Sequence, residues 1–131
     1  MFKKEDLSNF YGSDQFTLVR FFGREFLITS GVDFVLANGG DGENGTAHWL
    51  LDAILSHQGN RKLKTERMRE FQVWKLKKMK GTKARLSCED GDGLEVVRQI
   101  IPYTDFCIDE ISIWGEMNSM GGMTFLLPSE H

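Results

Sequence analysis

The segment 46–57, TAHWLLDAILSH, constrains the fold of this chain more than any other stretch. On a helical wheel its apolar side chains cover well over half of the circumference, and the polar residues His48, Asp52 and Ser56 form one stripe at intervals of four. A helix that is apolar around most of its perimeter is buried rather than laid on the surface. We therefore expect a central helix, with the hydroxyl of Thr46 as its N-cap and Trp49 in the core.

The remaining sequence reads as strands and two further short helices. Gly31–Ala37, capped by Ser30, and residues 3–10 have the features of helices. Runs of β-branched and aromatic residues broken at Gly, Asp or Asn predict strands within 16–22, 25–29, 71–79, 84–89, 94–101, 111–117 and 122–128. The fold class that we expect is α+β, in one domain spanning residues 1–131. Its twisted antiparallel sheet is a meander of about five to seven strands, with two or three short helices packed against one face.

Two glycine-rich segments and one turn connect these elements. Residues 11–14 and the segment Asp90–Gly93 have the composition of turns. The loop Gly39–Gly45 carries only two carboxylates, which is a weak signal for a divalent cation. The chain has no HExxH motif and no Cys/His cluster, so we expect no metal site and no cofactor.

The composition favours a protein of a reducing compartment that has no membrane-spanning segment. No apolar run approaches the roughly 18 residues of a membrane helix, and no signal-peptide pattern opens the chain. The two cysteines, Cys88 and Cys107, fall in expected strands without metal-binding spacing, and we interpret them as core thiols. These features predict a cytoplasmic protein.

The net charge of −3 conceals a strong separation of charge along the chain. Residues 61–85 hold eleven Lys and Arg and two Glu, whereas the rest of the chain holds five Lys and Arg and seventeen acids. Such asymmetry steers the approach of charged partners.

The basic segment is the best candidate for a binding surface. Basic residues that surround an aromatic side chain are suited to phosphate contacts and base stacking. The alternative is a solvated edge strand whose lysines prevent aggregation and whose Trp74 faces the core. A third reading has the basic arm docking on an acidic protein or on a second copy. The candidate residues are Arg61, Lys62, Lys64, Arg67, Arg69, Trp74, Lys75, Lys77 and Lys78.

A cleft around His48, Asp52 and Asp105 is the candidate for an enzyme. A hydrolase triad within the helix is excluded, because Ser56 lies two helical turns, roughly 12 Å, from His48. The alternative is that the polar stripe is the solvent-facing edge of the helix, and that Asp105 caps a neighbouring element.

Four motifs in order resemble a family of small bacterial and phage proteins of unknown function, the DUF6876 family. These are AHWLLDAILSHQ (47–58), FQVWKL (71–76), YTDF (103–106) and LPSEH (127–131). In this family an aromatic residue usually stands at the position of His48 and a proline at that of Cys107. The resemblance implies a shared fold, no established activity, and a home in mobile or accessory genomes.

Together these features favour a small interaction or regulatory module without enzymatic activity, such as a phage- or plasmid-borne accessory protein that binds a host macromolecule. Another protein is the partner that we expect, with nucleic acid and a second copy of the chain as alternatives. Nucleic-acid binding through residues 61–85 and a small enzyme remain the competing hypotheses.

Overall fold

The computed structural model describes residues 1–12, 15–42 and 44–131. Ser13 and Asp14 of the expected turn, and Glu43 of the expected glycine-rich loop, lie outside the described residues. The strands of the described part are β1 (Phe16–Phe21), β2 (Arg24–Thr29), β3 (Phe71–Lys78), β4 (Ala84–Glu89), β5 (Glu95–Ile101), β6 (Glu110–Met117) and β7 (Met123–Leu126). The helices are α1 (Ser30–Asn38), α2 (His48–Ser56), α3 (Glu66–Glu70) and the 3-10 turns η1 (Lys4–Asn9), η2 (His57–Gly59), η3 (Arg61–Leu63) and η4 (Pro128–Glu130).

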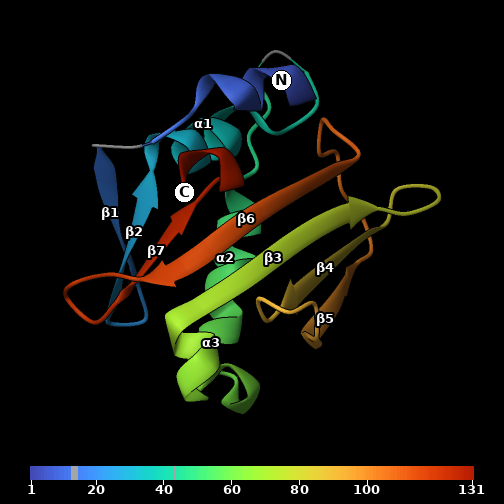
Figure 1. Cartoon of the computed structure of the whole chain (residues 1–131). Helices are drawn as coiled ribbons and strands as arrows, with labels where there is room; N and C mark the ends of the chain where they lie inside the picture. The colour runs from blue at the N-terminus through green and yellow to red at the C-terminus, as the bar shows by residue number, and fades with distance from the viewer. Residues whose placement is uncertain (13–14, 43) are drawn as a thin grey trace.

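The strands form one sheet in the order β1-β2-β7-β6-β3-β4-β5 (Figure 1). Every neighbouring pair is antiparallel except β2 and β7, which run parallel with Phe26 opposite Met123. The α+β class is confirmed. The sheet is mostly antiparallel, as expected, but it is not one continuous meander: the longest run of consecutive strands that are neighbours is β3, β4 and β5. The β6–β7 hairpin fits between β2 and β3, and this placement makes β7 parallel to β2.

The first hairpin has the shortest connection that an antiparallel pair allows. Phe21 pairs with Arg24, so only Phe22 and Gly23 lie between the strands. Both have positive φ, 48° and 76°. This is the signature of a type I′ turn, whose twist matches that of the flanking strands. The two strands expected within 16–22 and 25–29 are thus joined by a tight hairpin, with an aromatic residue where Asn or Asp is usual.

The N-cap of each main helix lies one residue away from the expected position. The hydroxyl of Thr29 accepts a hydrogen bond from the amide of Val32, so Thr29 rather than Ser30 caps α1. Helix α2 begins at His48, and its N-cap Ala47 makes no side-chain bond. The expectation that Thr46 caps this helix is therefore wrong. The amide of Ala47 donates instead to the carbonyl of Leu36, 2.7 Å away, which ties the two helices together.

Helix α2 lies across one face of the sheet, behind β3 and β6 in Figure 1. Leu50 is 1% exposed and Ile54 is fully buried, as expected for a central helix. Trp49 is only partly buried, so the expectation that it lies within the core is wrong. The polar stripe of His48, Asp52 and Ser56 is exposed and forms the solvent-facing edge of the helix.

The last residues fasten the C-terminal turn onto α1. The carboxylate of Glu130 is buried and accepts hydrogen bonds from the Thr29 hydroxyl at 2.6 Å, from the Gly31 amide at 3.1 Å and from the Leu127 amide at 2.9 Å. A Cβ atom on Gly31 would lie 2.4 Å from the Glu130 carboxylate oxygen. The glycine is therefore needed for the close approach of the carboxylate to the helix N-terminus.

Both cysteines are free thiols, but only one of them lies in a strand. Cys88 is buried in β4, and burial raises its pKa to about 12. Cys107 lies in the loop before β6, so its assignment to a strand is wrong. Within the described ranges, no helix is both long enough and apolar enough to cross a bilayer.

Candidate functional site

The basic segment 61–85 does not form one surface, because it runs through η3, α3, β3 and part of β4. Trp74 faces α2 and is 1% exposed. Its indole N–H donates to the Gln72 side-chain oxygen at 2.8 Å, and its ring stacks on His57 with 5.7 Å between centroids. Trp74 therefore belongs to the core, as the alternative interpretation expected, and cannot stack on a ligand.

Several basic residues of this segment are neutralised within the chain. Lys75 lies 2.7 Å from the Glu89 carboxylate, and Arg85 contacts Glu95. Arg67 contacts Asp92 and lies 3.6 Å from Asp90. The pKa of Asp90 is held below its ordinary value, first by the Leu94 amide and then by other turn amides and Arg67. These side chains form ion pairs within the sheet and with the β4–β5 turn, and the partner carboxylates largely neutralise their charge.

Lys64 and Arg69 are exposed, and they line a groove together with a third cation from a distant part of the sequence. This cation is Arg24, at the start of β2, and the groove has a volume of about 780 Å³. Among the described residues, no carboxylate forms an ion pair with any of these three side chains. We call this hollow the cationic groove. Its other lining residues are Glu25, Phe26, Gln58, Leu63, Gln72, Met117, Met120, Gly121, Gly122 and Met123.

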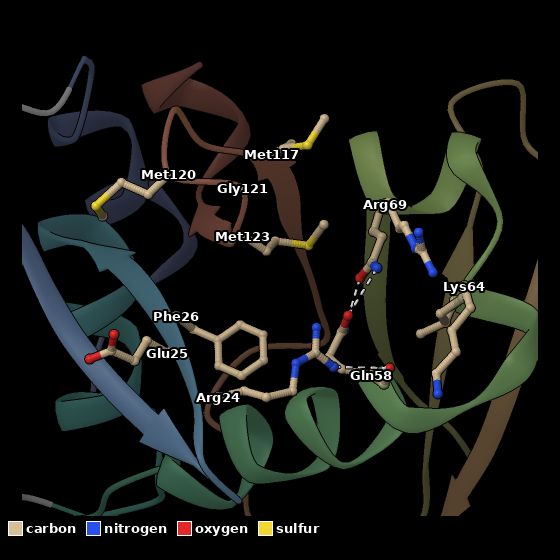
Figure 2. Close-up of a pocket in the computed structure, with 13 residues that line it drawn as sticks. Arg24, Glu25, Phe26, Gln58, Lys64, Arg69, Met117, Met120, Gly121 and Met123 are labelled. Atoms are coloured by element: carbon tan, nitrogen blue, oxygen red, sulfur yellow. Dashed lines mark hydrogen bonds between the residues drawn. The ribbon is translucent and has the colours of Figure 1, made fainter.

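The two walls of the cationic groove come from distant parts of the chain. Figure 2 shows Lys64 and Arg69 on one wall, and Met117, Met120 and Met123 on the opposite wall. Met117 and Met120 are 47% and 76% exposed. Thioether side chains are flexible and polarizable, so such a wall adapts to the shape of an apolar partner.

The floor of the groove is rigid. Gln58 and Gln72 donate to each other through their side-chain amides at 2.9 and 3.0 Å, and both are buried. Gln72 also donates to the Met68 carbonyl at 3.0 Å and accepts from the indole of Trp74. A buried polar network with all of its hydrogen bonds made holds its members in one arrangement. The floor of the groove is therefore preformed and does not need a ligand to order it.

Arg24 is held at this floor by neutral groups. Its Nη1 atom donates to the backbone carbonyl of Gln58 at 3.2 Å, and its guanidinium lies 5.2 Å above the Phe26 ring (Figure 2). The adjacent carboxylate of Glu25 pairs with Arg20 instead, at 3.2 Å. Arg24 is thus oriented without being neutralised, and its remaining N–H groups are free to meet an anion.

A smaller aromatic pocket of about 200 Å³ adjoins the groove and shares Arg24 and Phe26 with it. It is lined by Phe21, Phe22 and Leu55. Phe22 is 92% exposed and holds a left-handed backbone, φ 48°, which costs energy for a bulky residue. Strain kept at an exposed aromatic residue points to a functional role for its side chain.

Of the three residues proposed for an enzyme cleft, His48 and Asp52 lie about one helical turn apart on α2, and Asp105 lies in the loop before β6. His48 and Asp52 lie on the exposed edge of α2. Asp105 accepts a hydrogen bond from the Asp41 amide at 3.4 Å, in the loop after α1. Within residues 1–12, 15–42 and 44–131, no hydrogen bond joins any two of these three side chains. The same ranges contain no group of three or more His, Cys, Asp or Glu side chains that could hold a metal ion.

The four motifs noted in the sequence take up four structural positions. The first forms α2 and ends at Gln58, and the second supplies Gln72 and Trp74. Phe106 of the third motif is 1% exposed and packs against Gly39. Glu130 of the fourth motif accepts a hydrogen bond from the Gly31 amide at the start of α1. A model of a protein family of unknown function, DUF6876, matches residues 1–131. The chain belongs to the DUF6876 family. No curated protein and no solved structure matches the chain.

Proposed function

We propose that this member of the DUF6876 family is a small binding module that docks an acidic segment of another protein in the cationic groove. The observation that supports this is that Arg24, Lys64 and Arg69 line one groove and that, in the part of the chain that the structure describes, none of them forms an ion pair with a carboxylate. Cations that converge without internal neutralisation leave a positive potential for an incoming anion.

The shape and lining of the site favour an acidic segment that also carries apolar side chains. Carboxylates of the segment would meet the three cations, and Arg24 can hold one of them through two parallel hydrogen bonds. An apolar side chain three or four residues away would enter the aromatic pocket beside Phe22 and Leu55. The exposed methionines would pack over the remainder.

Nucleic acid is the competing occupant of a basic surface. Affinity for nucleic acid comes from cations that follow the phosphate backbone and from aromatic side chains that stack on bases. Here Trp74 is buried, Lys75 and Arg85 are paired, and the whole chain carries a net charge of −3. These observations favour a protein partner over nucleic acid.

His48, Asp52 and Asp105 are exposed, and no hydrogen bond joins their side chains within the described part of the chain, which favours binding over catalysis. A cytoplasmic location and an accessory role for a phage or plasmid stay predictions of the sequence.

The proposal is tested by fluorescence anisotropy with three labelled probes: a peptide of alternating Glu and Leu, the same peptide with Gln for Glu, and a single-stranded oligonucleotide. Neutralising the groove with Lys64→Gln and Arg69→Gln is expected to weaken binding of the acidic peptide by roughly two- to thirtyfold, as the loss of two exposed charge contacts does. The Gln peptide should bind little in either protein.

The matched control is Lys77→Gln with Lys78→Gln, which removes the same charge at the far end of β3. This control should leave binding of the acidic peptide unchanged. Equal weakening in both double variants would mean that binding depends only on net charge, and would contradict the proposal. Tight oligonucleotide binding that is lost in the control would support the nucleic-acid alternative.

A further inference from the structure

The two edges of the sheet differ in how they are protected against pairing with another strand. Edge strands are normally blunted by charges, proline or β-bulges. The β5 edge carries Glu95 and Arg98, is distorted by a bulge opposite Cys88 and Glu89, and ends before Pro102. Strand β1 contains no proline and no bulge, and its only charged residue is Arg20. Its pairing with β2 continues without a shift over all six residues.

The unprotected edge also presents apolar side chains. Phe16 and Leu18 are 51% and 49% exposed, on the face of the sheet opposite α2. Along an antiparallel strand, every second residue directs its N–H and C=O groups to one neighbouring strand, and the residues between them direct theirs to the other side. In a hairpin with a two-residue turn, the two residues that flank the turn are hydrogen-bonded to each other. Because Phe21 and Arg24 flank this turn, the backbone groups of Phe16, Leu18 and Arg20 point away from β2. No described strand pairs with this outer edge.

We propose that β1 pairs with β1 of a second copy of the chain in an antiparallel, two-fold symmetric dimer. Opposite residues of a ladder lie on the same face of the sheet, so the symmetric register that uses all the outward backbone groups is centred on Leu18. In this register Leu18 lies opposite its own copy, and Phe16 of each chain lies opposite Arg20 of the other.

The sequence of β1 is complementary to itself in this register. The leucine pair buries apolar surface on the two-fold axis, and the Arg20 guanidinium of one chain covers the Phe16 ring of the other. The ion pair of Arg20 with Glu25 holds the guanidinium on that face. Both copies use the same edge, so the contact closes at two chains and does not continue into a fibre.

Sedimentation velocity over a range of concentrations tests the dimer directly. The wild-type chain is expected to change from monomer to dimer as the concentration rises. Leu18→Lys, which places two like charges on the axis, should remain a monomer. The matched control Ile100→Lys puts the same charge on the β5 edge, at a side chain that is 45% exposed, and should still dimerise.

A second measurement leaves the residues of the proposed contact unchanged. A nitroxide label on Thr17→Cys, an exposed position of β1, in a Cys107→Ser background, should show strong dipolar broadening, whereas a label on Ile100→Cys should not. A wild-type chain that is monomeric at every concentration would overturn the proposal. A dimer that persists in Leu18→Lys, or labels at position 17 without broadening, would equally overturn it. The groove residues Arg24, Lys64 and Arg69 are not in β1, so the outcome is independent of the proposed function.

Discussion

The buried carboxylate of Glu130 shows how one residue joins the end of the chain to the start of α1. Its three hydrogen bonds reach the Thr29 hydroxyl and the amides of Gly31 and Leu127. Removal of such an acceptor leaves buried donors without partners, at a cost of about 1–3 kcal/mol. The contact also requires that residue 31 has no side chain.

Gly31→Ala is therefore expected to lower the free energy of unfolding by about 1–3 kcal/mol, because the new methyl group meets the carboxylate. The same substitution should cost less in a Glu130→Ala background, where the obstructing carboxylate is absent. Urea denaturation of the two single variants and the double variant measures this coupling. Strictly additive effects would show that the two residues do not contact each other.

Cys88 illustrates the effect of burial on a titrating group. Desolvation raises its pKa to about 12, above the ordinary value of 9.0. The unfolded chain therefore loses this proton first, and the contribution of Cys88 to stability is expected to fall as the pH rises through 9.0 toward 12. In the folded protein at pH 8, iodoacetamide should leave Cys88 unmodified. Mass spectrometry of the modified protein checks this, and rapid alkylation of Cys88 under native conditions would contradict it.

At the scale of the element, α2 buries one side of its surface in the core, through Leu50, Leu51, Ile54 and Leu55. Ile54→Ala should lower the free energy of unfolding by about 2–5 kcal/mol, because the side chain is fully buried. Trp49→Ala should cost less than a core tryptophan does, because Trp49 is only partly buried. Chemical denaturation of both variants gives the comparison, and a larger loss in Trp49→Ala would contradict the assigned packing.

The β1–β2 turn combines strain with an exposed aromatic residue. Phe22→Asn is expected to stabilise the protein by about 1 kcal/mol, because asparagine tolerates a left-handed backbone better than phenylalanine. The same variant should bind the peptide of alternating Glu and Leu more weakly, because the aromatic pocket loses one wall. Thermal denaturation and anisotropy on one preparation test both parts. A stabilised variant with unchanged affinity would remove Phe22 from the site.

Local chemistry explains which elements could be predicted from the sequence. The apolar perimeter of α2 and the break at Gly23 between two apolar runs are local signals, and α2 and the strands β1 and β2 were predicted from them. The helix caps were each misplaced by one residue, since Thr29 and Ala47 take these positions through contacts with Val32 and Leu36. The parallel pairing of β2 with β7 joins strands almost one hundred residues apart, and no local pattern specifies such a pairing.

At the scale of the whole molecule, the separation of charge along the chain was a partial guide to the site. It singled out residues 61–85, and two basic residues of this segment, Lys64 and Arg69, line the groove. It could not show that Lys75 and Arg67 are neutralised by acids from β4 and the following turn. Arg24 was missed because its contribution depends on the fold bringing β2 beside η3 and α3. An unusual Phe-Gly turn was the one local signal for that side of the groove.

The measurement that tests the central claim most directly is an NMR titration of the ¹⁵N-labelled chain with the peptide of alternating Glu and Leu. The account predicts that shifts concentrate at the Gln58 and Gln72 side-chain amides, at the Arg69 amide and at Gly121 and Gly122. Amides near Lys77 and Lys78 should stay in place. Shifts centred on β3 and β4 around these lysines, with the Gln58 and Gln72 resonances unmoved, would show that the cationic groove is not the binding site.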